Sequence, residues 1–590
     1  MCGICGELRF DGAYPDPDRL RRMLARLERR GPDDEGLYSE GPVALGHRRL
    51  AIIDLSEHAH QPMIDPEAGL AIVFNGTIYN YPELREELIA RGHRFVSHGD
   101  TEVILRAFAE WGEQCVERLL GMFAFAIWNL RTQSLFLARD RLGIKPLYYS
   151  QAREYFRFAS TTQALLAAGE VDTGIDAVAL HHLFTLHAVV PAPRTILRGV
   201  RKLPPAHCLT IDPLGRHHLR RYWTLHARRP PEPRDKAEWR AAIHDALRRA
   251  VGRRLKIADV PVGVLLSGGL DSSLLVALLA EQGVRDLQTF TIGFEDHPDE
   301  KGSEFEYSDP VAERYHTRHH KFHYPNAEVL PRLPEAVAQM SEPMFAQDAV
   351  AFYLLAEQVS RHVKVVQSGQ GADEVFAGYF WYPQMQQAGG SWLDRFRRRY
   401  FDRDHDEFAR MIEARWVDRD YTSPLIEELL HSVDAETFLD AVLAVDVTTL
   451  IVDDPVKRVD NMTMAWGLEA RVPFLDHELV ELAAQMPPEY KLEHGGKGIL
   501  KEIARELLPA AVIDRPKGYF PMPALKYLRG EFLDFVGDIL DSRACRERGL
   551  YRRDYVERLL AEPEQHHTRI KGNKLWHLAA LELWFQQQGL

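Results

Sequence analysis

The sequence lacks several features, and each absence narrows what the chain can be. Five cysteines among 590 residues, an odd number, do not make a disulfide framework and suit a reducing compartment. No apolar run approaches the roughly 18 residues of a membrane-spanning helix, and the start Met1-Cys2-Gly3-Ile4 does not resemble a signal peptide. We therefore expect a cytoplasmic protein that does not bind membranes.

An excess of positive charge is also missing, because the net charge is -13. Proteins that bind nucleic acid usually gather basic residues on one face, so we expect small-molecule substrates and no nucleic acid. The chain has no low-complexity tract, and its 45% hydrophobic and 27% charged residues are typical of globular proteins. Its 590 residues exceed what one hydrophobic core organises, which predicts two domains.

The first domain is predicted to be a layered α/β domain over residues 1–210. Apolar segments at 70–74, 122–128 and 135–138 are too short for helices and are bounded by turn residues, which is typical of strands. An amphipathic helix at 20–27 is predicted to stop before Gly31-Pro32. Such a pattern favours sheets covered by helices.

A stretch rich in proline and arginine, residues 211–235, is predicted to link this domain to a second one at 236–590. In the second domain, buried-type strands at 262–266, 289–294 and 363–367 alternate with helices, as in a doubly wound parallel sheet. Beyond about residue 385 the pattern is mostly helical and ends on an apolar helix near 575–584.

Cys2 is a candidate nucleophile. If Met1 is removed, Cys2 carries a free α-amine beside its thiol, and the amine can take the thiol proton and later return it to a leaving group. Two other interpretations stand beside this one. Cys2 can be an ordinary second residue, or it can join Cys5 in a CxxC redox or metal site, although no second pair of ligands is spaced to complete such a site.

Three further groups suit recognition of an amide substrate. Arg49 ends a predicted strand with a guanidinium that can hold a carboxylate. Asn75-Gly76 can polarise a developing oxyanion, although Asn-Gly is more often a simple turn. Asp100 precedes a helix, where it can act as an N-cap or bind a substrate ammonium.

Together these segments, with residues 1–6 and 30–33, resemble the N-terminal-nucleophile glutaminase domain of class II glutamine amidotransferases. The resemblance implies Cys2 as the nucleophile, Asn75 and Gly76 as the oxyanion hole, Arg49 as the clamp on the glutamine carboxylate and Asp100 as the partner of its α-amine. It further implies Leu50, Ile52, Ile53 and Thr77 as glutamine-binding residues. Thr77 stands where many relatives have an acidic residue near the glutamine amine.

A predicted strand at 262–266 runs into Ser267-Gly268-Gly269-Leu270-Asp271-Ser272-Ser273 and then into an apolar helix. Glycines let backbone N–H groups and the helix N-terminus point at phosphates. The loop is neither a Walker loop nor a GxGxxG fingerprint, and an ordinary glycine-serine turn is the competing interpretation. A second loop, 368–374, also ends in acids, so Asp271 and Asp373 are candidate ligands for Mg²⁺ on the phosphates.

These two loops resemble the pyrophosphatase-type nucleotide site of asparagine synthetases, and further matches at 460–465, 469–476 and 515–518 extend the similarity over nearly the whole chain. Such enzymes cleave ATP to AMP and pyrophosphate through an acyl-adenylate. The resemblance implies that Lys517 neutralises the departing pyrophosphate. The implied ATP-binding residues are Leu265, Ser267, Gly268, Gly269, Asp271, Ser272, Ile292, Ser368, Gly369, Gln370 and Asp373.

Gln370 departs from this family pattern, because some relatives have a glutamate there that supports attack by ammonia. Gln370 cannot act as a base, so we expect another arrangement or Glu374 in that role. The whole chain is predicted to use glutamine, ATP and Mg²⁺ to amidate a carboxylate acceptor, with a sealed passage for ammonia. A homodimer is one assembly we consider.

The acceptor is predicted to be something other than aspartate, because the stretch 343–352 contains no cation to hold a free α-carboxylate. With the segments 187–193 and 452–458, the chain most resembles the branch that amidates N-acetylglutaminylglutamine. Three alternatives remain: aspartate as the acceptor, a glutaminase joined to a sugar-phosphate or phosphoribosyl partner, and a non-catalytic regulator or scaffold. The phosphoribosyl partner has no use for the loop 267–273, and the scaffold has no use for Cys2 and Asp271.

Overall fold

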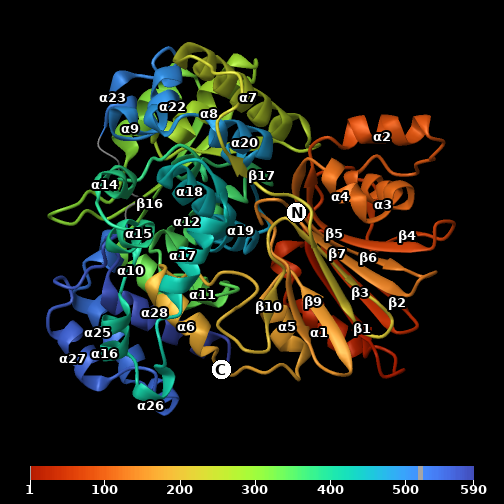
Figure 1. Cartoon of the computed structure of the whole chain (residues 1–590), viewed down its shortest axis with the longest axis horizontal. Coiled ribbons are helices and arrows are strands. Elements are labelled where there is room, and N and C mark those ends of the chain that lie inside the picture. Colours follow the sequence, from red (N-terminus) through yellow and green to blue (C-terminus); the bar gives the residue numbers. More distant parts are fainter. Residues whose placement is uncertain (1, 516–521) are drawn as a thin grey trace.

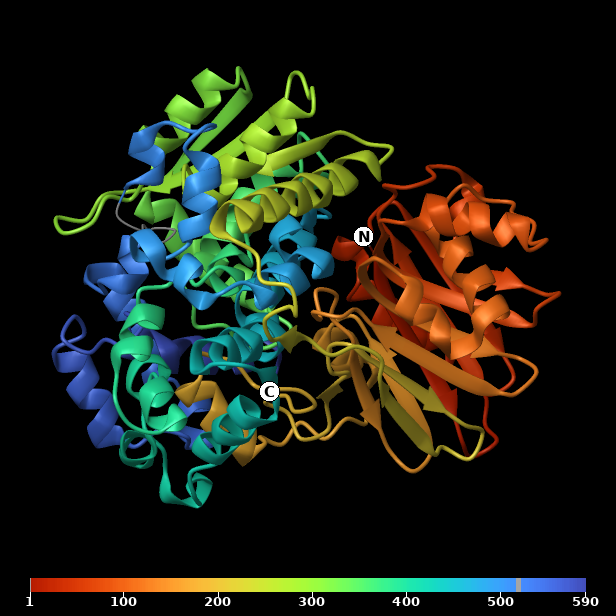
Figure 2. The ribbon, with the colours of Figure 1, turned by 45° about the horizontal axis from the view of Figure 1, so that its top comes forward.

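The structure is a computed structural model that describes residues 2–515 and 522–590. Figures 1 and 2 show two lobes that lie side by side, a smaller one formed by the first part of the chain and a larger one formed by the rest. None of the described helices combines the length and the apolar character needed to cross a membrane.

Two six-stranded sheets form the smaller lobe, and their described strand pairs are antiparallel. In spatial order the first sheet contains β10 (Arg201–Lys202), β8 (Tyr148–Gln151), β9 (Tyr155–Ala159), β1 (Gly3–Arg9), β3 (Val43–Arg49) and β2 (Asp34–Glu40). The second contains β12 (His217–Arg221), β11 (His207–Ile211), β7 (Ser134–Arg139), β6 (Gly121–Asn129), β5 (Leu70–Ile78) and β4 (Met63–Asp65).

An apolar core fills the space between these sheets, where Leu8 and Leu45 of the first meet Val73 and Ala126 of the second. Helices α1 (Pro17–Ala25) and α5 (Thr162–Ala168) pack on the first sheet. Helices α2 (Tyr81–Ala90) and α3 (Asp100–Trp111) lie on the side of the second sheet (Figure 1). The predicted αββα layering is therefore confirmed.

A five-stranded parallel sheet organises the larger lobe. Its spatial order is β16 (Arg318–Tyr324), β15 (Gln288–Phe294), β14 (Val262–Leu265), β17 (Val365–Gln367) and β19 (Glu469–Arg471). Packed around it are α7 (Lys236–Lys256), α8 (Leu270–Glu281), α9 (Phe305–Arg314) and α12 (Asp348–Val359). The predicted doubly wound sheet is confirmed.

Helices dominate the chain after this sheet, as predicted. They include α13 (Ala372–Val375), α14 (Trp381–Gln387), α15 (Trp392–Tyr400), α16 (His405–Met411), α17 (Thr422–Ser432), α18 (Phe438–Val445), α19 (Lys457–Met464), α20 (His477–Gln485), α25 (Gly530–Asp541), α27 (Arg553–Ala561) and α28 (Lys574–Gln587). Two short π-helical turns, Asp446–Leu450 and Val452–Val456, lead directly into α19.

The segment that connects the lobes takes part in the sheets of both lobes. Within the range 211–235, β12 pairs with β11 in the second sheet, and β13 (His226–Ala227) pairs with β18 (Asp434–Ala435) of the larger lobe. Helix α6 (Ala177–Thr185) leaves the smaller lobe and packs among the later helices (Figure 1). The domain division near residue 210 stays a prediction.

Candidate functional site

Cys2 lies immediately before β1, beside the middle of β5. Its backbone nitrogen donates to Asn75 Oδ1 at 3.0 Å. Among the described residues, Asn75 Nδ2 is buried and has no hydrogen-bond partner, so it is available to a ligand. Gly76 is required by its surroundings, because a Cβ there would lie 2.2 Å from the Met122 carbonyl oxygen. Asn75-Gly76 is therefore part of a strand paired with β6, and the turn interpretation is wrong.

A small cavity of about 30 Å³ opens at Cys2, and we call it the small pocket. It collects most of the residues predicted to bind glutamine, together with residues that sequence reasoning did not name. Its walls include Cys2, Arg49, Leu50, Ile52, Ile53, Gly76, Thr77, Asp100 and Glu469. The predicted set thus converges on one place.

Arg49 ends β3 at the wall of the small pocket. Its Nη1 donates to the Ser56 carbonyl at 3.1 Å and its Nη2 donates to the Asp54 carbonyl. These bonds hold the guanidinium against the loop that follows β3 without neutralising its charge. The charge is therefore available to a substrate carboxylate.

Asp100 is the first residue of α3, and its carboxylate accepts a hydrogen bond from the Ile78 nitrogen at 3.0 Å. Gly99 is the N-cap, so the N-cap interpretation of Asp100 is wrong. Burial raises the pKa of Asp100 to about 6, although the bond from Ile78 opposes that effect. Asp100 is thus a carboxylate at neutral pH and takes up a proton in mild acid.

Burial raises the pKa of the Cys2 thiol, despite the opposing influence of a backbone hydrogen bond from Leu50 and of Arg49. The thiol therefore needs a base close by before it can attack. Cys5, by contrast, packs in the core with Leu24 of α1.

The second predicted site lies in the larger lobe, in a cavity of about 480 Å³ that we call the large cavity. Strand β14 ends at Leu265, and the loop that follows turns at Gly268, where φ is +73° and a Cβ would lie 2.5 Å from the Ser308 nitrogen. Helix α8 then begins with its N-terminus beside the cavity, an arrangement that favours anions. The local motif therefore folds as predicted.

Nine of the predicted nucleotide residues line this cavity: Leu265, Ser267, Gly269, Asp271, Ser272, Ser368, Gly369, Gln370 and Asp373. Gly268 does not line the cavity but allows the turn of the loop through its positive φ. Ile292 is buried in β15 and does not line the cavity, where Phe290 and Thr291 of the same strand do. Lys517 lies outside the described residues, so its role stays a prediction.

Asp271 and Asp373 meet at Lys497, a residue that sequence reasoning missed. The Lys497 Nζ lies 2.6 Å from Asp271 Oδ2 and 2.8 Å from Asp373 Oδ1. Burial opposes its charge, but the two carboxylates raise the pKa of Lys497. Asp271 and Asp373 offer oxygen ligands of the kind that Mg²⁺ takes, and in this structure the Lys497 ammonium lies between them.

Gln370 lines the large cavity, whereas Glu374 lies behind Tyr379, whose hydroxyl donates to Glu374 Oε1 at 2.7 Å. Burial raises the pKa of Glu374 to about 8, with a further contribution from Asp373. Glu374 thus reaches the cavity through Tyr379 rather than directly.

The wall of the large cavity also contains Asp348, Phe352 and Arg458. The expectation that this site lacks a buried arginine is therefore wrong, because Arg458 comes from α19 and not from 343–352. Its guanidinium is already paired: Nη2 lies 3.2 Å from Asp348 Oδ2, and Nη1 lies 2.6 Å from Asp454 Oδ1.

Helix α19 also contacts the smaller lobe through Asp460. Arg30 donates to Asp460 at 2.9 Å and Lys145 donates to it at 3.0 Å, while the Arg30 Nε donates to the Cys2 carbonyl at 3.3 Å. Burial disfavours the Asp460 charge, but Arg30 and Lys145 lower its pKa to about 2. The residues around Cys2 are thus tied to the helix that lines the large cavity.

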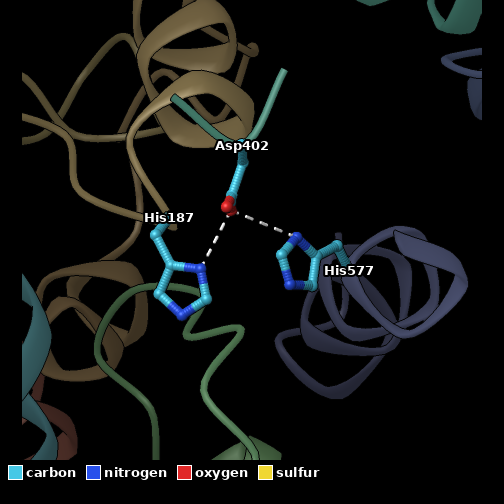
Figure 3. Close-up of side chains that lie close together, drawn as sticks. All are labelled: His187, Asp402 and His577. Carbon is cyan, nitrogen blue, oxygen red and sulfur yellow. Dashed lines mark hydrogen bonds and ion pairs between the residues drawn. The ribbon is translucent and has the colours of Figure 1, made fainter. Parts of the chain in front are cut away.

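A separate buried cluster joins His187, Asp402 and His577 from three distant segments (Figure 3). Asp402 Oδ2 lies 2.9 Å from His187 Nδ1 and 3.6 Å from His577 Nδ1. Arg403 Nη1 lies 3.4 Å from His577 Nδ1 and opposes a further cation there. We interpret the cluster as an internal ion pair with a neutral histidine beside it.

Comparison with known protein families agrees with both sites. A family model described as asparagine synthase matches residues 242–586, and one described as glutamine amidotransferase domain matches residues 1–223. The chain belongs to the asparagine synthase family. This membership decides against a phosphoribosyl partner for the glutaminase domain.

Two curated relatives illustrate the similarity. Asparagine synthetase [glutamine-hydrolyzing] 3 of Bacillus subtilis is 32% identical, and the match covers 99% of this chain and 98% of the length of that relative. A putative asparagine synthetase [glutamine-hydrolyzing] of Mycobacterium bovis is 33% identical over 91% of this chain and 90% of its own. A solved glutamine phosphoribosylpyrophosphate amidotransferase from B. subtilis covers 54% of this chain and 90% of its own at a TM-score of 0.31 and 15% identity.

The chain is therefore a glutamine-hydrolysing, ATP-dependent ligase of the asparagine synthetase type. Its smaller lobe is the glutaminase domain and its larger lobe the synthetase domain.

Proposed function

We propose that this enzyme releases ammonia from glutamine in the small pocket and uses it in the large cavity to amidate N-acetylglutaminylglutamine. The observation that carries the two-step reaction is the convergence of Cys2, Arg49 and Asp100 in one pocket, with Asn75 bonded to Cys2, and of both glycine-rich loops around a second. Asp460, held by Arg30 and Lys145, lies on the side of Cys2 that faces the synthetase domain, where a passage for ammonia would begin.

In the glutaminase step the Cys2 thiol attacks the side-chain amide carbon of glutamine. After removal of Met1 the α-amine of Cys2 takes the thiol proton and passes it to the departing ammonia. Asn75 Nδ2, which has no partner among the described residues, donates to the oxyanion. Water then hydrolyses the thioester and releases glutamate.

In the synthetase step the acceptor carboxylate attacks the α-phosphate of ATP, and pyrophosphate leaves. Mg²⁺, when bound, would neutralise phosphate charge beside Asp271 and Asp373. Lys497 would neutralise charge on the departing pyrophosphate, and we propose the same role for Lys517. Ammonia then displaces AMP. Since Gln370 has no basic group, the ionised fraction of Glu374, which grows as the pH rises toward its pKa of about 8, receives the released proton through Tyr379.

The large cavity supports a blocked dipeptide rather than aspartate as the acceptor. Arg458 is its buried arginine, but Asp348 and Asp454 already neutralise that guanidinium. A free α-carboxylate that bound Arg458 would have to break one of these pairs, and a buried charge without a partner is costly. N-acetylglutaminylglutamine carries amide groups and a single carboxylate, which is the group to be converted. The proposal includes a cytoplasmic location.

The second candidate acceptor is aspartate, as the names of the curated relatives suggest. The two acceptors are compared at equal concentration by glutamine-dependent AMP formation, and kcat/KM is determined for each. We expect a clear preference for the blocked dipeptide. A preference for aspartate would identify the chain as an ordinary asparagine synthetase.

A further inference from the structure

One wall of the small pocket comes from the synthetase domain. Glu469, the first residue of β19, lines the pocket together with Cys2, Arg49 and Asp100. The Thr77 hydroxyl donates to Glu469 Oε1 at 3.3 Å, across 392 residues of sequence. Both side chains are buried, so this contact is shielded from water.

The charges of the pocket match a zwitterionic amino acid. Glutamine carries an α-carboxylate, for which Arg49 supplies a cation, and an α-ammonium, which needs anions. Among the described residues that line the pocket, only Asp100 and Glu469 are carboxylic acids. Thr77, which also lines the pocket, carries no charge of its own.

The two acids differ in how firmly they hold their charge. Asp100 has a pKa of about 6 because of burial. Burial also disfavours the charge of Glu469, but Arg471, Lys145 and other neighbouring positive charge lower its pKa to about 2. Glu469 is therefore a carboxylate near neutral pH, and its Oε1 also accepts a hydrogen bond from Arg471 Nε.

We propose that Glu469 of the synthetase domain is a glutamine-binding residue that recognises the substrate α-ammonium together with Asp100, with the Thr77 hydroxyl fixing its orientation. The inference rests on the proposed glutaminase activity of the small pocket. The glutamine site is then complete only when the two domains are docked.

The position of Glu469 also places it close to the nucleotide loop. Strand β19 contains only Glu469, Ala470 and Arg471, and the Arg471 carbonyl accepts a hydrogen bond from the Ser368 nitrogen at 2.9 Å. Ser368 lines the large cavity. A single short strand therefore contacts the glutamine pocket at one end and the nucleotide loop at the other.

The test compares glutamine with glutaramate, which is glutamine without the α-amine, as substrates for ammonia release by the full-length enzyme. In the Glu469→Gln variant we expect kcat/KM for glutamine to fall about tenfold or more, since a hydrogen bond to a charged group is lost. The value for glutaramate should stay within about threefold, because glutaramate has no ammonium to recognise. A purely structural role would lower both values together and would overturn the proposal.

Two further variants protect the test against misfolding. Thr77→Val removes the hydroxyl but leaves the ion pair between Glu469 and Arg471, and it should reduce the preference for glutamine by a smaller factor. Thr77→Asp in the Glu469→Gln background returns a carboxylate to the pocket and should restore the preference. No change with Thr77→Val together with no rescue by Thr77→Asp would contradict the proposed role.

A matched control is Glu342→Gln. Glu342 is another buried acid between the domains, where it accepts from Lys202 at 2.8 Å, but it does not line the small pocket. This variant should keep the wild-type ratio of the two substrates, and a loss of the ratio would assign the effect to general domain docking. If the wild-type enzyme released no ammonia from glutamine, the proposed function itself would fail, which is a distinct result.

Discussion

The small pocket and the large cavity are built in opposite ways. Antiparallel strands of the two sheets place Cys2, Arg49 and Asn75 close together, and the pocket beside them has a volume of about 30 Å³. The large cavity of about 480 Å³ lies where loops follow parallel strands. Its cations Lys497 and Arg458 already form ion pairs with carboxylates of the cavity wall. The first site is confined among packed side chains, whereas the second is a much larger cavity.

The largest expected effect separates the two sites completely. Cys2→Ala should lower glutamine-dependent synthesis by about 1,000-fold or more, because the nucleophile is lost, and should leave synthesis from free ammonia intact. An enzyme that keeps Met1 should behave in the same way, since the free α-amine of Cys2 is missing. AMP formation is measured with each nitrogen source.

Cys5→Ala is the control, because Cys5 packs in the core and not in the small pocket. It should retain glutamine-dependent synthesis. Equal loss of glutamine-dependent and ammonia-dependent synthesis in Cys2→Ala would contradict the division of labour between the two sites.

The reverse effect is expected at the large cavity. Asp271→Asn leaves Lys497 with one carboxylate instead of two and weakens the candidate Mg²⁺ site, so acceptor-dependent pyrophosphate release should fall about 100-fold. Ammonia release from glutamine should persist. Near-native pyrophosphate release would remove Asp271 from its assigned role.

How much of each site the sequence could predict depends on how locally the site is encoded. The loop at Ser267 and the Cys2 start are continuous segments, and their residues converge as predicted. Glu469, Lys497 and Arg458 were missed because each comes from a segment that is distant in sequence from the motifs that mark its site. Glu469 lay within a segment that matched the family, but only its contact with Thr77 and its place in the pocket wall show which pocket it lines.

Strand boundaries show the same limit. The expected strand at 70–74 extends to Ile78, because Asn75 and Gly76 continue the ladder opposite Ala124 and Phe123. Asn-Gly favours turns locally, and the long-range pairing outweighs that preference. Ile292 was placed at the nucleotide by resemblance alone, while Phe290 and Thr291 of the same strand line the cavity.

A smaller effect distinguishes the two acids of the small pocket. Because the pKa of Asp100 is raised to about 6, kcat/KM for glutamine should decline as the pH falls through about 6, when Asp100 gains a proton. Synthesis from ammonia should not show this inflection. In Asp100→Asn the inflection should disappear, whereas its persistence would assign the titration to another group.

The smallest effect concerns His187, which follows helix α6 in the segment that packs among the helices of the larger lobe. His187 has a left-handed backbone, with φ of +54°, and its imidazole pairs with buried Asp402. Burial lowers the pKa of His187, but Asp402 outweighs this effect and raises the pKa above 6.5. Asp454 adds to this effect, and Arg458 opposes it.

Since the folded state binds the proton more tightly than the unfolded state, the stabilisation is fully present below pH 6.5 and is lost as the pH rises through the folded pKa. Each unit of that shift corresponds to about 1.4 kcal/mol. His187→Asn tolerates the left-handed backbone but carries no charge, so its deficit in the free energy of unfolding should be largest near pH 6 and smaller near pH 9. Denaturant unfolding at both pH values measures it, with exposed His58→Asn as the control. A deficit that does not change with pH would show that His187 contributes packing and not charge.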